Sequence, residues 1–201
     1  MRPRILKMPP SHRQELRSMV TRRLQLSNAV ARERTRLDRT LHHLAKQSID
    51  AVIAFLRQQI RDMDAAIRSL IAEHSELKEL NKLIRSVTGI GPQTAAVLMA
   101  ELLELGRIDH KSISSLVGVA PHNVDSGNMR GKRCIHGGRE TVRNMLYMAA
   151  LSAIRYHDEL RDFYQRLILK GKTPKVAIVA AMRKLLIIIN AKVRDFYAQT
   201  T

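Results

Sequence analysis

One segment, residues 122–143, combines a serine with several cations and reads HNVDSGNMRGKRCIHGGRETVR. It has no apolar period, so we expect a loop, in which Ser126 lies between Asp125 and Gly127. A serine hydroxyl can attack a phosphorus atom when a base takes its proton and cations stabilise the charge of the transition state. Asp-Ser-Gly is also an ordinary turn sequence. The cations predict phosphate contact under either interpretation, and they are Arg130, Lys132, Arg133, Arg139 and Arg143.

A glycine turn between two expected helices is a second candidate for phosphate contact. In LIRSVTGIGPQTAAVLMAEL, residues 83–102, an apolar helix is expected to end at Gly89, and Pro92 opens the next helix. This is the sequence form of a helix-hairpin-helix, because free N–H groups at the start of the second helix can hold a DNA phosphate. We therefore predict DNA contacts at Gly89, Gly91 and Thr94. An ordinary helix connection closed by a glycine is the alternative.

Metal and redox chemistry have little support in the pattern of residues. The histidines lack a spacing that specifies zinc. Glu101 and Glu104 could share a helix face, but no group of several acids suits a two-metal site. Cys134 is the single cysteine, so no intrachain disulfide is possible, which fits a reducing cytoplasm. We expect no metal in this chain.

The net charge points to a polyanionic partner. The 201 residues contain 35 Lys and Arg against 18 Asp and Glu, a formal net charge of +17. No apolar run approaches the roughly 20 residues of a transmembrane helix, so no membrane partner is expected. Residues 1–48 hold 12 cations and 3 acids, and this scarcity of acids favours a nucleic-acid-facing arm over a merely solvated face. The arginines of that arm are Arg13, Arg17, Arg22, Arg23, Arg32, Arg34, Arg36 and Arg39.

The elements that position these segments are expected to be helices throughout. Residues 11–88 contain neither Gly nor Pro, and apolar residues at 49, 53, 56, 60, 63, 67 and 70 form a coiled-coil seam. A single helix would be ~115 Å long, so we expect two antiparallel helices that fold back near residues 45–50. We predict an all-α fold: a connector over 1–10, a coiled-coil helical arm over 11–80, and a compact helical domain with the helix-hairpin-helix-like motif over 81–201.

Four motifs, in order, resemble the C-terminal part of bacterial insertion-sequence transposases of the IS110 type, in an IS1111-like subgroup. They are SVTGIGPQTAAVLMAELLELG, LVGVAPHNVDSGNMRGKR, IHGGRETVRNMLYMAAL and KVAIVAAMRKLLIIINA. The similarity runs from about residue 3 to residue 195. It implies a DNA recombinase in which an N-terminal resolvase-like domain holds a magnesium-binding Asp/Glu/Asp/Asp set, followed by a coiled coil and a serine-bearing C-terminal domain.

The resemblance also implies roles and partners. The serine of the family's Ser-Gly motif falls on Ser126, which would attack the scissile phosphodiester and form a covalent protein–DNA intermediate. Duplex DNA, a structured guide RNA and further copies joined through the coiled coil are the implied partners, in a bacterial cytoplasm near the nucleoid. None of this chain's carboxylates aligns with the magnesium set, so no cofactor is expected here and we expect a truncated form. The alternative is a catalytically incomplete nucleic-acid-binding fragment that oligomerises through its coiled coil.

Overall fold

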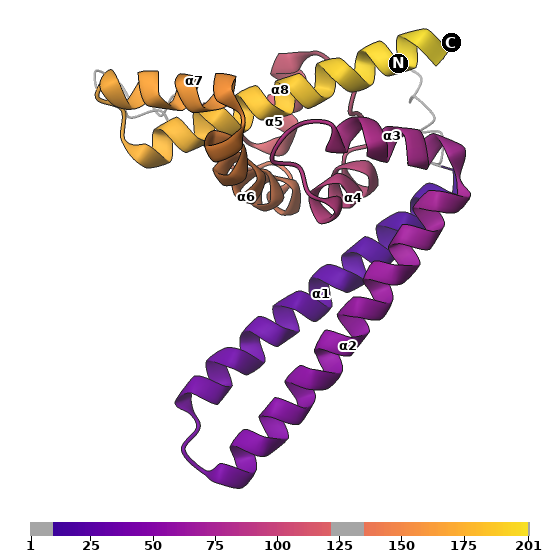
Figure 1. Ribbon diagram of the computed structural model, residues 1–201, viewed down its shortest axis with the longest axis vertical. Helices are drawn as coiled ribbons and strands as arrows, with labels where there is room; N and C mark the ends of the chain where they lie inside the picture. The colour runs from indigo at the N-terminus through magenta and orange to yellow at the C-terminus, as the bar shows by residue number, and fades with distance from the viewer. Residues whose placement is uncertain (1–9, 122–134, 201) are drawn as a thin grey trace, which may run out of the picture. The chain divides into compact units, whose positions relative to one another are not determined.

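The computed structural model describes residues 10–121 and 135–200, which form two compact units, Met1–Lys78 and Glu79–Thr201 (Figure 1). Every regular element among these residues is a helix, so the expected all-α class is confirmed. The units divide two residues before the boundary expected from the sequence. No helix in the described ranges is both long and apolar enough to cross a membrane.

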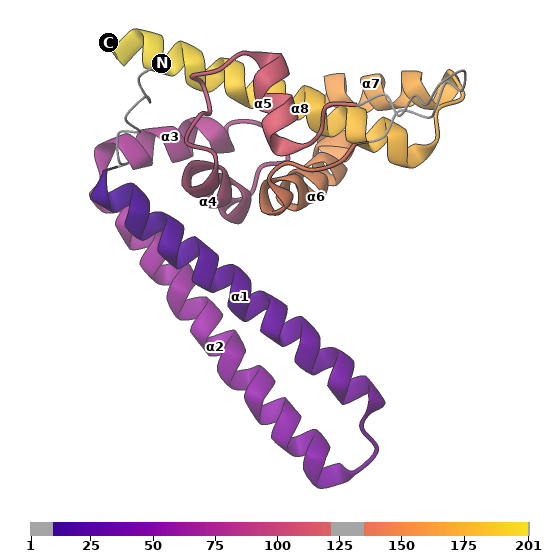
Figure 2. The ribbon, with the colours of Figure 1, turned by 180° about the vertical axis from the view of Figure 1, so that it is seen from behind.

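The first unit is an antiparallel hairpin of two long helices, α1 Ser11–Arg39 and α2 His43–Glu73, which lie side by side in Figures 1 and 2. The predicted seam of α2 is buried or half-buried along its whole length. Its partners on α1 are the buried side chains of Leu16, Val20, Leu26 and Val30. Removing each such aliphatic side chain from water contributes about 1.5–3 kcal/mol, which explains why two helices without breakers pair.

The turn of the hairpin lies earlier than the expected residues 45–50. Thr40, the C-cap of α1, donates its hydroxyl to the carbonyl of Arg36 (2.8 Å) and its amide to that of Leu37 (3.1 Å). Both bonds satisfy carbonyls that the end of a helix leaves open. The extended backbone at Thr40 and His42 then lets α2 begin at His43.

α3, Ser75–Arg85, crosses the boundary between the units, and five further helices complete the second unit. They are α4 Pro92–Glu101, α5 His110–Val117, α6 Glu140–Tyr156, α7 Asp158–Leu169 and α8 Pro174–Thr200. α8 packs along α5, α6 and α7, and α6 also packs on α4 (Figure 2). The core contains fully buried side chains from each of α4, α5, α6, α7 and α8, among them Leu98, Ile113, Leu146, Leu160 and Leu185.

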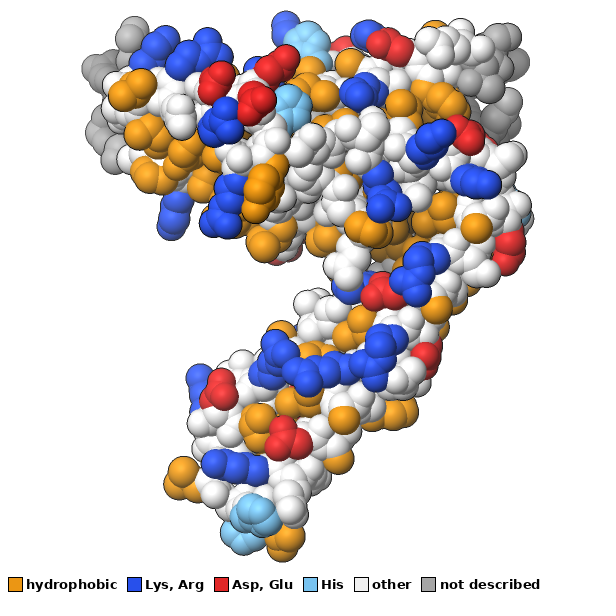
Figure 3. All heavy atoms as spheres, in the orientation of Figure 1, with side chains coloured by type: hydrophobic (Ala, Val, Ile, Leu, Met, Phe, Trp, Pro, Cys, Tyr) orange, Lys and Arg blue, Asp and Glu red, His pale blue; other side chains and the backbone are white. Residues whose placement is uncertain are grey.

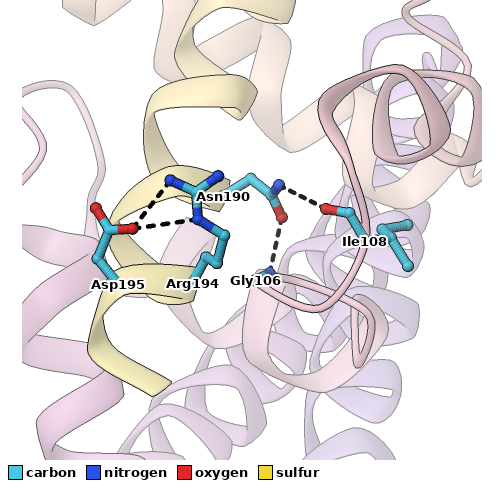
Figure 4. A network of polar contacts seen from close by, with 5 residues as sticks. All are labelled: Gly106, Ile108, Asn190, Arg194 and Asp195. Atoms are coloured by element: carbon cyan, nitrogen blue, oxygen red, sulfur yellow. Dashed lines mark hydrogen bonds and ion pairs between the residues drawn. The ribbon is translucent and has the colours of Figure 1, made fainter. Parts of the chain in front are cut away.

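A buried amide fastens the loop between α4 and α5 to α8. Asn190 is 5% exposed; its Oδ1 accepts from the amide of Gly106 (2.7 Å) and its Nδ2 donates to the carbonyl of Ile108 (3.0 Å; Figure 4). Gly106 has φ +78°, and a Cβ there would lie 2.7 Å from Cγ1 of Val193. The loop therefore needs both this glycine and this amide to approach α8.

Candidate nucleic-acid interface

The serine segment itself, residues 122–134, lies outside the described residues, and with it the predicted site residues Ser126, Arg130, Lys132 and Arg133. The chain on both sides of it is described. α5 ends at Gly118 before the segment, and Arg139 is the N-cap of α6 after it.

The two flanks of the segment touch each other through glycine backbone. Gly118 (φ +76°) ends α5 in the left-handed conformation, and a Cβ added to it would lie 2.2 Å from the carbonyl oxygen of Gly137. A Cβ on Gly138 (φ +71°) would lie 2.4 Å from the amide nitrogen of Gly118. The amide of Arg139 also donates to the carbonyl of Leu116 (3.1 Å). No side chain larger than hydrogen fits at Gly118 or Gly138, so these two glycines allow the described flanks to lie against each other.

Two of the predicted phosphate-binding cations take part in holding these flanks. Arg139 forms a double hydrogen bond with the carboxylate of Glu104 (2.6 Å for each oxygen) and also donates to the carbonyl of Glu101. Arg143 donates to the carbonyl of Gly137. Their predicted DNA contacts stay predictions, but within the unit both guanidinium groups have structural partners, and the charge of Arg139 is balanced by a carboxylate.

In the region of the expected helix-hairpin-helix, two of the three predicted DNA-contacting residues, Gly89 and Thr94, pack within the second unit. α3 ends at Arg85, before Gly89, and Gly89 (φ +95°) lies against α6, where a Cβ would be 2.7 Å from Cβ of Ala153. Gly91 is the exposed N-cap of α4, has extended backbone and has open space around its Cα. Thr94 is 6% exposed, so its side chain faces the interior of the unit.

The first turn of α4 is nevertheless open to a ligand. Gly91, Pro92 and Gln93 are exposed, and no side chain caps the helix. The first helical bond runs from the amide of Ala95 to the carbonyl of Gly91 (3.0 Å), so the amides of Gln93 and Thr94 precede the hydrogen-bonded ladder. Backbone donors at this position are the kind that can hold a phosphate, and the predicted contact there stays a prediction.

Carboxylates near these elements have structural partners. Asp109 caps α5, and hydrogen bonds from the hydroxyl of Ser112 and the amides of Ser112 and Lys111 lower the pKa of Asp109 to about 2. Glu104 is held by Arg139 at 2.6 Å. Across residues 10–121 and 135–200, no three His, Cys, Asp or Glu side chains gather where they could hold a metal ion.

The arginines of α1 divide into two kinds. Arg13, 5% exposed, pairs with Glu76 at 2.6 Å, and Arg23 pairs with Asp64 at 3.0 Å. These two stabilise the first unit from within. The remaining arginines of the arm are exposed, and Arg36 is paired with Glu33 one turn away. The nucleic-acid-facing role predicted for this arm therefore rests on the exposed arginines alone.

Comparison with known sequences identifies the second unit. Residues 81–165 match the family profile described as "Transposase IS116/IS110/IS902 family". The chain belongs to this transposase family. The matched part of the chain contains α4, α5, α6 and most of α7, and thus both flanks of the serine segment.

Named relatives extend the similarity over most of the chain. The "Pilin gene-inverting protein" of Moraxella bovis is 29% identical over 185 residues, which cover 90% of this chain and 57% of that protein. The "Insertion element IS110 uncharacterized 43.6 kDa protein" of Streptomyces coelicolor is 25% identical over 150 residues, covering 74% of this chain and 36% of that protein. The "Insertion element IS900 uncharacterized 42 kDa protein" of Mycobacterium paratuberculosis is 30% identical over 148 residues, covering 70% and 35%. The chain thus spans little more than half the length of the pilin gene-inverting proteins.

Several site residues were not found from sequence. Gly118, Gly137 and Gly138 belong to the glycine-rich stretch around the serine, whose composition predicted only a loop. Asn190 carried no motif, and Glu104 was singled out only with Glu101 as a possible metal pair, not as the partner of Arg139. The signal that could have marked Asn190 is its type, because a lone amide at the end of the apolar run of residues 185–191 needs hydrogen-bond partners when it is buried.

Proposed function

We propose that this chain acts in DNA transposition or recombination, with duplex DNA as its substrate. The family match over residues 81–165 is the observation that carries the proposal. Relatives named for pilin gene inversion and for insertion elements support it. The formal net charge of +17 suits a polyanionic substrate.

Within that function we propose Ser126 as the nucleophile. Its Oγ forms a bond to the scissile phosphorus while the bond from phosphorus to a deoxyribose oxygen breaks. The proton of the serine passes to a base, and the leaving oxygen takes up a proton as it becomes a hydroxyl. One phosphoester replaces another, so the step needs no oxidant and no other energy source. Arg130, Lys132 and Arg133 would stabilise the developing negative charge.

The anchored flanks support this assignment. A nucleophile must be delivered to within contact distance of its target, and small displacements reduce the rate steeply. Gly118 and Gly138 bring the two flanks of the serine segment together, and the ion pair of Arg139 with Glu104 ties the second flank to the loop after α4. The described residues on both sides of the segment thus belong to one packed part of the unit.

A covalent adduct provides the test of the nucleophile. The chain is mixed with a full-length family member, labelled duplex DNA and magnesium, and denatured samples are examined for protein–DNA adducts. We expect an adduct on this chain with Ser126 and none with Ser126→Ala, while Ser115→Ala, a change on α5, keeps it. An adduct that persists in Ser126→Ala would refute the assignment.

The catalytically incomplete fragment remains the second candidate. The first unit favours it through an apolar surface on α2 and the hairpin turn that no described residue covers: Leu41 (93% exposed), Leu44 (66%), Phe55 (63%) and Val52 (43%). Such a surface suits association with another hairpin, as the family's coiled coil implies. In the adduct experiment this candidate predicts DNA binding and co-purification with the full-length protein, without any adduct on this chain. We propose binding of a structured guide RNA both for the chain with Ser126 as nucleophile and for the catalytically incomplete fragment.

A further inference from the structure

Nearly all of the net charge lies in two stretches of the sequence. One is residues 1–48; the other is residues 163–194, which contain eight Lys or Arg and no Asp or Glu. The second stretch covers most of α7 and α8 and lies almost wholly beyond the family match at 81–165. Its cations are Arg166, Lys170, Lys172, Lys175, Arg183, Lys184, Lys192 and Arg194.

The turn between α7 and α8 presents three of these cations on ordered backbone. The amide of Gly171 donates to the carbonyl of Ile168 (2.8 Å) and that of Lys172 to Leu167 (3.0 Å), which closes the end of α7. Lys170, Lys172 and Lys175 are exposed, and none forms an ion pair with a described carboxylate. The positive end of the α8 helix dipole lies at the same turn and adds to their potential.

Two more cations of α7 and α8 lie around one aromatic ring. Nζ of Lys184 on α8 is 5.1 Å from the centre of the Phe163 ring, and Cζ of Arg166 on α7 is 6.0 Å from it. Such contacts hold cations by the face of a ring without neutralising them. Like charges from two helices therefore gather at this ring, and neither cation forms an ion pair with a described carboxylate.

The acids of α7 lie at its other end. Asp158, Glu159 and Asp162 belong to its first half, and Asp158 is paired with Arg161 at 2.7 Å. In Figure 3, red side chains lie nearer the start of α7, and blue and orange side chains lie toward the end where it turns into α8. Charge is thus separated along α7, and the uncompensated end concentrates positive potential that attracts anions.

We propose that this surface binds the phosphodiester backbone of duplex DNA. The α7–α8 surface comprises Arg166, Lys170, Lys172, Lys175 and Lys184. Lysine is a flexible point charge suited to phosphate contacts, which position a duplex without reading its sequence. The exposed apolar residues beside it, Ile168, Leu169 and Val176, are aliphatic and offer no ring for stacking unpaired bases, which favours a duplex over a single strand. The inference rests on the proposed function for its choice of DNA.

The salt dependence of binding tests the surface. Affinity of the full chain for a random-sequence duplex is measured across salt concentrations, for the wild type and for Lys170→Gln/Lys172→Gln/Lys175→Gln. Each phosphate contact contributes about 0.9 to the slope of log affinity against log salt, so the triple variant is expected to lose roughly 2–3 from that slope. The matched control is Arg57→Gln/Arg68→Gln/Lys78→Gln. It removes the same three positive charges from a stretch in which acids and cations alternate, so the salt slope is expected to stay as in the wild type.

The outcomes separate this inference from the proposed function. If the wild type fails to bind duplex DNA at low salt, both fall together. If the wild type binds and the triple variant keeps its slope, or the control loses as much, the α7–α8 surface is overturned and the proposed function stands. The α7–α8 surface as a DNA site is also overturned if the triple variant binds duplex DNA as the wild type does and loses only its binding to structured RNA or to phosphatidylserine vesicles. Thermal unfolding followed by circular dichroism checks that each variant is folded. If the triple variant is unfolded, the single variant Lys172→Gln replaces it, with an expected loss of about 0.9 from the slope of log affinity against log salt.

Discussion

At the start of α6, the guanidinium groups of Arg139 and Arg143 bond to Glu104 and to backbone carbonyls of the same unit. At the turn between α7 and α8, the ammonium groups of Lys170, Lys172 and Lys175 are exposed, with no described carboxylate paired to them. Both regions are rich in cations, yet in the first the charge is used to hold the flanks of the serine segment. The comparison teaches that positive charge marks a binding surface only where the fold leaves it uncompensated.

The largest effect is expected from a substitution at the glycine contact between the two flanks of the serine segment. Gly138→Ala places a Cβ 2.4 Å from the amide nitrogen of Gly118, at a residue with φ +71°. Left-handed backbone alone costs an alanine about 1–2 kcal/mol, and the overlap with backbone adds to that. We expect a large loss of unfolding free energy in urea, together with loss of any adduct on Ser126.

Gly137→Ala is the matched control for that change. Gly137 has φ +66°, and a Cβ there meets no atom within 4 Å, so only the conformational cost of about 1–2 kcal/mol applies. Equal losses of unfolding free energy in the two variants would show that the approach of the flanks does not constrain the unit.

An intermediate effect is expected at the ion pair that ties α6 to the loop after α4. Arg139 and Glu104 are 32% and 36% exposed, so solvent screens them partly. In a double-mutant cycle with Arg139→Ala and Glu104→Ala, we expect a coupling of about 1 kcal/mol in unfolding free energy. We also expect Arg139→Ala to change the salt slope of DNA binding less than Lys172→Gln does.

Arg161 and Asp158 provide the comparison pair for the cycle. They lie 2.7 Å apart within one turn of α7, but are 43% and 82% exposed. Their coupling should be only about 0.3 kcal/mol, as for other exposed pairs on one helix. A coupling at Arg139 and Glu104 no larger than this would mean that Arg139 does not hold the flank, and its role as a DNA contact would gain support.

The sequence predicted the helices better than the contacts between them. A long stretch without Gly or Pro and a regular apolar seam were enough to predict the hairpin. The position of its turn was wrong by a few residues, because no Gly or Pro marks it and the extended backbone of Thr40 ends α1. Helix ends are predicted from Gly, Pro and capping residues, so an end that none of these marks is located only to within a few residues.

The candidate site was predictable in composition and not in geometry. Glycine and cation density indicated a loop, but the contact of Gly118 with Gly138 joins residues that the serine segment separates. The partner of Arg139 lies 35 positions away, and a cation's type does not reveal whether a carboxylate will meet it in the fold. The acid-free stretch of residues 163–194 was readable in the sequence. Only the structure shows that Lys170, Lys172 and Lys175 are exposed at one turn, and that Lys184 and Arg166 share the ring of Phe163.

The smallest effect is expected from pH, at a carboxylate whose hydrogen bonds are all internal. The bonds from the hydroxyl of Ser112 and from two amides lower the pKa of Asp109 to about 2 from an ordinary 3.8, so the folded state binds the proton more weakly than the unfolded state. Its contribution to stability is therefore fully present above pH 3.8 and is lost as the pH falls through about 2.

Asp109→Asn isolates this contribution, because asparagine caps a helix about as well and does not ionise. As the pH is lowered from 5 to 2, the unfolding midpoint of the wild type should fall more than that of Asp109→Asn. DNA binding at neutral pH should be the same for both. A difference that stays constant over this range would show that the cap of α5 does not depend on the charge of Asp109. Loss of DNA binding in the variant would instead place this end of α5 with the α7–α8 surface, among the regions whose charge serves a partner.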